Sequence, residues 1–143
     1  MFSGCTSLTA APELPVTTLA EGCYNGMFSG CTSLTTAPTL PATTLAKDCY
    51  NNMFARCTSL TAAPILPATT LAETCYKFMF YSSKKINKIT MLATDISASG
   101  CLNRWLYDVA STGTFTKSPE MTSLPTGDSG IPSGWTVADY GAA

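Results

Sequence analysis

The stretch "MFSGCTSLTAAPELPVTTLAEGCYNG", residues 1–26, is followed by two near-copies of itself, "MFSGCTSLTTAPTLPATTLAKDCYNN" at 27–52 and "MFARCTSLTAAPILPATTLAETCYKF" at 53–78. A fourth, degenerate copy covers 79–104, where Ser83 stands in the place of the first repeat cysteine and Cys101 in the place of the second. One such copy is too small to bury its own apolar side chains, whereas stacked copies share a core. The 26-residue period therefore predicts a solenoid.

Each copy divides into two halves with different patterns. One half has apolar residues at every fourth position: Leu19, Cys23, Met27 and Cys31. This spacing predicts a helix with one buried stripe, and Thr18 with Glu21 matches the capping box of a helix start. The other half, "SLTAAPELP" at 7–15, contains Pro12 and Pro15, which exclude a helix. We expect a short parallel strand before Pro12 and a polyproline-like segment after it.

The repeat fades toward the C-terminus. A partial fifth copy begins at Trp105, and one column of the repeat grows in size toward this end: Ala11, Ala37, Ala63, Ile89 and Phe115. We therefore expect a solenoid over 1–104 and a partial coil with a C-terminal cap over 105–143. The first copy starts in mid-repeat with no matching cap, so its inner face is expected to self-associate or to dock on another chain. That face comprises Met1, Phe2, Cys5 and Leu8.

The repeat resembles that of the BspA-like leucine-rich-repeat family, large surface proteins of gut and oral anaerobic bacteria. The residues that carry the resemblance are Met27-Phe28, Cys31, Ser33-Leu34, Leu40-Pro41, Thr43-Thr44-Leu45 and Cys49-Tyr50. The predicted fold class is thus a repeat solenoid of leucine-rich-repeat type (α/β), with about four 26-residue helix-plus-short-strand coils and a C-terminal cap. The resemblance implies adhesion or protein binding rather than catalysis, at the cell surface or outside the cell.

The composition excludes several classes of function. Net charge is −1 and only 12% of residues are charged, so a nucleic-acid partner is not expected. No apolar run reaches the ~20 residues of a membrane span, and the N-terminus does not read as a signal peptide, so any export signal lies outside this chain. There is no histidine to act as a general base for "GDSG" at 127–130, which we interpret as a polar turn. The nine acidic residues are scattered, and we expect neither catalytic residues nor a cofactor.

Seven cysteines and two aromatic columns remain to be explained. Without histidine or a Cys-x-x-Cys pair, a metal site is not expected, and we favour a ladder of reduced, mostly buried thiols over a disulfide such as Cys5–Cys31. Core packing is also favoured for both aromatic columns, with a sugar-binding strip as the alternative. The columns are Phe2, Phe28, Phe54 and Phe80, and Tyr24, Tyr50 and Tyr76.

The positions that differ between copies indicate where a partner would bind. Position 13 changes most in character, from Glu13 to Thr39 to Ile65, on the extended half of the repeat. We predict a binding face there, made of Thr9, Glu13, Thr35, Thr39, Thr61 and Ile65. The leading function is a non-enzymatic interaction or adhesion module that binds a host or bacterial surface protein or glycan. The alternative is a structural subunit of a surface or virion assembly, docked through its uncapped first coil.

Overall fold

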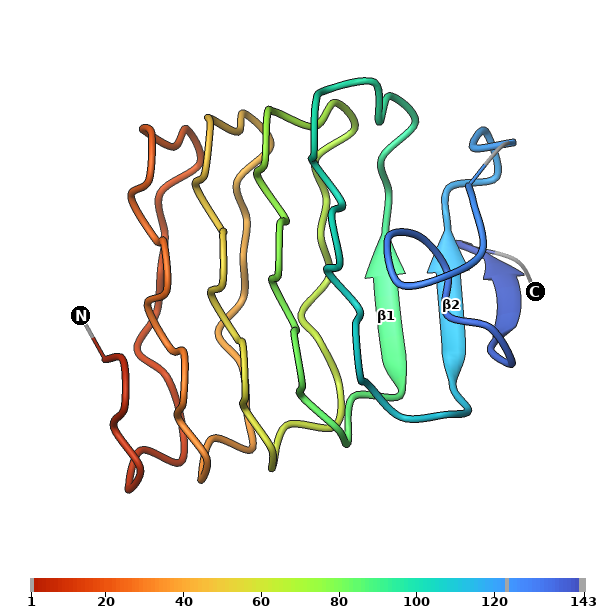
Figure 1. Cartoon of the computed structure of the whole chain (residues 1–143). Coiled ribbons are helices and arrows are strands. Elements are labelled where there is room, and N and C mark those ends of the chain that lie inside the picture. Colours follow the sequence, from red (N-terminus) through yellow and green to blue (C-terminus); the bar gives the residue numbers. More distant parts are fainter. Residues whose placement is uncertain (1, 123, 142–143) are drawn as a thin grey trace.

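The computed structural model describes residues 2–122 and 124–141 as a stack of coils, in which two long runs of chain face one another (Figure 1). We call the runs 6–18, 32–44, 58–70 and 84–96 the arms, and the runs 20–31, 46–57, 72–83 and 98–108 the turn segments. Three short parallel strands lie at the C-terminal end in the order β1-β2-β3. They are β1 (Lys88–Met91), β2 (Thr114–Lys117) and β3 (Thr136–Asp139).

The predicted fold class, a leucine-rich-repeat solenoid of α/β type with a helix in each coil, is wrong. The described residues contain no helix at all, and the regular secondary structure is the small parallel sheet. It follows that no helix in this part of the chain has the length and apolar character that crossing a membrane demands.

The segments predicted to be helical are instead chains of four-residue turns. Every second amide donates to the carbonyl three residues earlier, as Met27 N does to Tyr24 O (3.1 Å). The amides between them donate to the next coil, as Tyr24 N does to Cys49 O (3.0 Å) and Phe28 N to Met53 O (2.9 Å). Half of the amides that a helix would satisfy internally are thus satisfied by the neighbouring coil.

The four-residue spacing explains why the sequence pattern resembled a helix. In an α-helix a step of four residues overshoots a full turn by about 40°, so a strict four-residue stripe drifts off the buried face. Tandem turns repeat at four residues without drift. In the second turn segment the pairs Cys49-Tyr50 and Met53-Phe54 and then Cys57 are all buried. The match of Thr18 and Glu21 to a capping box was coincidental, because Thr18 pairs with Thr44 in a parallel bridge.

The turns require a positive φ at every fourth residue. In the first turn segment these residues are Gly22, Gly26 and Gly30, with φ of 64°, 65° and 75°. Later copies place other residues in the same conformation: Asp48, Asn52, Arg56, Thr74, Phe78, Ser82, Arg104 and Asp108. A side chain in this left-handed region costs roughly 1–2 kcal/mol, so the tertiary contacts override a substantial local preference.

The core is built from columns of equivalent side chains in successive coils. Phe2, Phe28, Phe54 and Phe80 stack with ring centroids 5.5–5.6 Å apart. Tyr24, Tyr50 and Tyr76 stack at 6.0 Å and lead to Trp105 at 5.8 Å. Phe28, Phe54, Phe80, Tyr50 and Tyr76 are buried, which confirms the prediction of core packing for them and rules them out as a sugar-binding strip.

The arms pair in parallel, but more weakly than predicted. Ala10 bridges to Thr36 directly before the Ala-Pro step, at the place where a short strand was expected. The first three arms keep only isolated bridges, because Pro12 and its equivalents cannot donate to a ladder. A strand, β1, forms in the fourth arm, where Lys88–Met91 contains no proline.

The first cysteine column carries a repeated hydrogen bond. The thiols of Cys31 and Cys57 donate to the carbonyls of Phe2 and Phe28, at 3.0 and 3.2 Å. In the next coil Ser83 Oγ donates to Phe54 O (2.6 Å) and accepts from Cys57 N (3.1 Å). Ser83 is therefore buried without an unsatisfied hydroxyl, which explains how a polar residue replaces cysteine there.

The C-terminal residues close over the last coil. Ile89 pairs with Phe115, and Phe115 pairs with Val137. The column of side chains that increase in size toward the C-terminus therefore runs through the sheet. The "GDSG" segment is a polar turn as predicted, and it contacts the fourth turn segment: Leu106 N donates to Asp128 O and Trp105 Nε1 to Gly130 O. A Cβ on Gly130 would collide with the carbonyl of Pro125, so only glycine fits.

Replacing Gly26 with alanine distinguishes tandem turns from a helix. A helix would gain up to about 1 kcal/mol from the substitution, whereas a left-handed position loses about 1 kcal/mol or more. A Cβ at Gly26 would meet nothing within 4 Å, so the effect is purely conformational. We expect Gly26→Ala to lower the free energy of unfolding measured in urea. The control is Asn25→Ala, an exposed neighbour without positive φ, which should change it little.

The cysteine column predicts an order of stability at residue 57. Serine can keep the bond to Phe28 O, as Ser83 does in the next coil, whereas alanine loses the donor and leaves a small cavity. We expect Cys57→Ala to reduce the free energy of unfolding by about 1–2 kcal/mol, and Cys57→Ser by less. Urea unfolding of the two variants checks this order, and an alanine variant as stable as the serine variant would contradict it.

Candidate functional site

The six residues of the predicted binding face all lie on the arms, and all are exposed. The structure brings two pairs of them together. Thr35 donates to Thr9 O through both its amide (3.0 Å) and its hydroxyl (3.3 Å). Glu13 and Thr39 line one pocket between the first and second arms.

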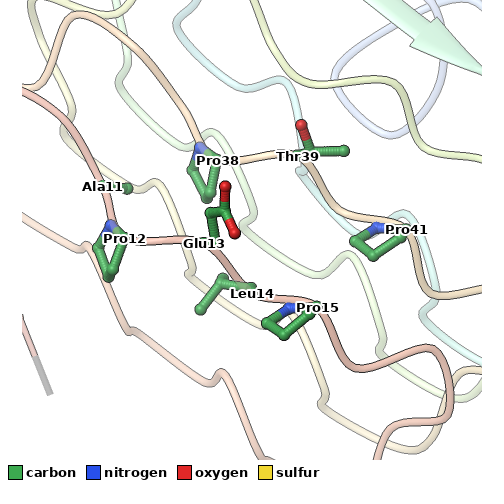
Figure 2. A pocket seen from close by; sticks show the side chains of 8 residues that line it. All are labelled: Ala11, Pro12, Glu13, Leu14, Pro15, Pro38, Thr39 and Pro41. Atoms are coloured by element: carbon green, nitrogen blue, oxygen red, sulfur yellow. The ribbon is translucent and has the colours of Figure 1, made fainter.

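This pocket is small, and half of its lining residues are proline. Its volume is about 180 Å³, and its lining residues are Ala11, Pro12, Glu13, Leu14, Pro15, Pro38, Thr39 and Pro41. Figure 2 shows the Glu13 side chain projecting toward the second arm, which carries Pro38 and Thr39. Leu14 is buried at its base. The arrangement is an apolar hollow with one carboxylate and one hydroxyl at its rim.

The other two predicted residues lie farther along the stack. Thr61 and Ile65 belong to the third arm and do not line the pocket of Glu13 and Thr39. The Ile65 side chain is 48% exposed, which is high for a large apolar residue. The predicted face is thus a row of separate features: a threonine pair, a proline pocket and an exposed isoleucine.

The thiols are buried rather than arranged for chemistry. Five of the seven cysteines are buried, Cys5 is half-buried and Cys23 is exposed, and all seven are free, as predicted for a ladder of reduced thiols. Burial raises the pKa of Cys49 to about 11, and that of Cys57 and Cys75 to about 12. A raised pKa suppresses the nucleophilic thiolate. Within 2–122 and 124–141 no three potential His, Cys, Asp or Glu ligands gather in a metal site.

The inner face of the first coil is less buried than its counterparts. Phe2, Cys5 and Leu8 are half-buried, whereas the equivalent Phe28, Cys31 and Leu34 of the next copy are fully buried. Met1, the fourth predicted member of this face, lies outside the described residues. Docking of another chain on this face stays a prediction.

A second pocket, on the turn segments, was missed by the sequence analysis. It is about 360 Å³ in volume and is lined by Asn52, Arg56, Phe78, Tyr81 and Arg104. The predicted binding face lay on the extended half of the repeat, where position 13 changes most in character, and it included none of these residues. The available signal was the replacement of Gly26 by Asn52 and Phe78, and of Gly30 by Arg56, at equivalent positions.

The buried thiols predict a loss of stability in alkali. Below about pH 8.5 the thiols are protonated in both the folded and the unfolded chain and contribute nothing to pH dependence. Above it the unfolded chain releases thiol protons that the folded chain retains at Cys49, Cys57 and Cys75. The free energy of unfolding should then fall by up to about 1.4 kcal/mol per pH unit for each thiol. Urea unfolding from pH 7 to pH 10.5 measures this slope.

The Cys57→Ser variant is the matched control, since its hydroxyl does not titrate in this range. Above about pH 8.5 its free energy of unfolding should fall less steeply with pH, by the contribution of one thiol. At pH 7 its stability should stay close to that of the unmodified chain. Thiol titration gives an independent reading: few groups should react in the folded chain and seven after denaturation. A stability that stays flat up to pH 10.5 would show that the thiols are accessible to water.

A function for this chain is therefore argued from the geometry described above, because comparisons with known proteins add no relative. No protein-family model, no curated protein and no solved structure matches this chain.

Proposed function

We propose that the chain is a non-enzymatic binding module that holds a surface protein or glycan against its stacked arms. The observation that carries this proposal is the pocket between the first two arms, where Glu13 and Thr39 stand at the rim of a proline-lined hollow. Binding sites are typically concave and mostly apolar, with a few polar groups that fix orientation. The pocket has this composition on a small scale, which suits one anchoring side chain of a partner rather than a whole small molecule.

The prolines favour binding for two physical reasons. The rings of Pro12, Pro15, Pro38 and Pro41 fix the backbone, so little conformational freedom is left to lose when a partner binds. Proline also has no amide hydrogen, so a partner that covers these residues leaves fewer donors without water. The wall is therefore rigid, and a partner that covers it loses little conformational entropy and desolvates few backbone donors.

Glu13 determines the kind of partner group that fits. Its exposed carboxylate gives the rim one negative charge beside the apolar hollow. A partner segment with an apolar side chain next to a lysine or arginine would match both features. Thr9, Thr35 and Thr61 add hydroxyls without charge, which suits polar and water-mediated contacts along the remaining arms.

The arms do not present the same chemistry in every copy. The equivalent positions run from the acidic Glu13 through Thr39 to Ile65, whose apolar side chain is 48% exposed. A single partner spanning these arms would meet a charged, a polar and an apolar contact in turn, which gives it one preferred register along the stack. The resemblance to BspA-like surface proteins supports adhesion at the cell surface as the setting.

The triple variant Glu13→Lys, Thr39→Lys, Ile65→Lys tests the arm face. A partner is first found by screening the unmodified chain on arrays of glycans and matrix proteins. The triple variant should then bind that partner at least about 10-fold more weakly in a surface-binding assay. It reverses the charge at Glu13, and at Thr39 and Ile65 it introduces ammonium groups that the partner would have to strip of water. Its melting temperature should stay within about 3 °C, since all three side chains are exposed.

A charge-matched control is available on the turn segments. Glu21→Lys, Asn25→Lys and Asn103→Lys make the same change in charge at three exposed positions away from the arms. This control should bind the partner as the unmodified chain does. Unchanged affinity of the arm variant would show that the partner uses another face. A large fall in its melting temperature would show that the arm residues stabilise the fold.

A further inference from the structure

The pocket on the turn segments gathers side chains from three successive coils. Asn52 and Arg56 come from the second turn segment, Phe78 and Tyr81 from the third, and Arg104 from the fourth. Its volume of about 360 Å³ lies in the range of small-molecule sites. Asn52, Phe78 and Arg104 are equivalent residues, 26 positions apart, so the stacking of coils alone places them in one column.

Four of these five residues occupy a conformation that favours glycine. Asn52, Arg56, Phe78 and Arg104 have φ of 60°, 58°, 54° and 48°. The first turn segment places Gly26 and Gly30 at the positions of Asn52 and Arg56 and makes the same turns. Large side chains thus stand where glycine serves the fold better, and such strain is typical of functional sites.

The pocket is cationic and has aromatic walls. The Arg56 guanidinium lies 5.6 Å from the centroid of the Tyr81 ring, and Lys77 Nζ lies 5.1 Å from that of Phe78. Tyr107, stacked on Tyr81 at 4.8 Å, extends the aromatic surface under Arg104. No carboxylate lines the pocket, and the salt bridges of the described residues are Lys47–Glu73, Lys84–Asp108 and Lys117–Asp139.

We propose that this pocket binds an anionic sugar, with a carboxylate or sulfate group held by Arg56 and Arg104 and the sugar ring packed on Phe78. Guanidinium groups form paired hydrogen bonds with planar and tetrahedral anions, and these are strongest where no protein carboxylate competes. The half-exposed Phe78 ring offers an apolar surface to the C–H face of a sugar. The Asn52 carbonyl can accept from a sugar hydroxyl, while its amide nitrogen donates to Asn51 Oδ1 (3.1 Å).

The shape and charge of the pocket favour a sugar over a nucleic acid. A nucleic acid is held by a basic track along several phosphates. Here two arginines line a single pocket, on a chain of net charge −1. The site is also separate from the arm face, because none of its lining residues lies on an arm. A test of this site therefore does not depend on the result for the partner proposed for the arms.

Titrations with small sugars test the proposal. Galacturonic acid supplies the carboxylate and N-acetylglucosamine 6-sulfate the sulfate, with galactose as the neutral sugar and inorganic sulfate as the bare anion. Each titration is followed by ligand-observed NMR. We expect one or both charged sugars to bind and galactose and sulfate to bind at least about 10-fold more weakly. Binding of galactose or sulfate as tight as that of both charged sugars, or no binding by either charged sugar, would overturn the proposal.

The decisive variant is Arg56→Gly with Arg104→Gly. Glycine is the favoured residue at both backbone positions, so the double variant should melt no lower than the unmodified chain while it binds the charged sugar about 10- to 100-fold more weakly. The control Lys85→Gln with Lys88→Gln removes the same charge at exposed positions outside the pocket and should bind normally. A lower melting temperature with unchanged binding would show that the arginines are structural and would overturn the assignment, as would equal weakening by the control.

Discussion

The hydrogen bonds between neighbouring turn segments hold the rest of this structure in place. Alternate amides of one coil donate to the carbonyls of the next, as Tyr50 N does to Cys75 O and Phe54 N to Met79 O. The remaining amides close four-residue turns within the same coil. Neither set is sufficient alone, because a chain of turns without its neighbour would leave half of its amides to water. The coil conformation is therefore a property of the stack rather than of any single copy.

This arrangement divides the positions of the repeat into two kinds. Residues such as Phe54 and Cys57 face inward and contact their equivalents in adjacent coils, so their size is tightly constrained. Residues at the positive-φ positions are constrained in backbone conformation but not in side-chain size. Gly26, Asn52, Phe78 and Arg104 therefore occupy one column with four different side chains. Variation at such a column changes the surface without disturbing the core.

Two surfaces with different chemistry result from the two sides of the coil. The first three arms present threonines, prolines and a single carboxylate at Glu13, a neutral to acidic surface suited to a polypeptide or glycan partner. The pocket on the turn segments presents Arg56 and Arg104 beside aromatic rings, a cationic site suited to an anion. The two pockets share no lining residue, so a ligand in one leaves the other accessible.

The sequence by itself determined which side chains face the core. The 26-residue period, the columns of Phe54 and Cys57 and the exclusion of helix by Pro12 and Pro15 follow from spacing and residue type, and the structure confirms them. The polar turn at 127–130 was also predictable, because its glycines and neighbouring prolines favour a turn in any context. Glu13, Thr39 and Ile65 could be identified as exposed from their variation between copies.

Tertiary structure alone decided the conformation of the turn segments. A four-residue apolar spacing over three steps fits either a helix or tandem turns, and the choice depends on hydrogen bonds to residues 25 positions away, such as Tyr24 N to Cys49 O. The same contacts impose positive φ on Arg56 and Phe78, which no local propensity would predict. The sequence shows large side chains in place of Gly26 and Gly30, but only the stacking of turns brings three coils together into the pocket of Asn52, Arg56, Phe78, Tyr81 and Arg104.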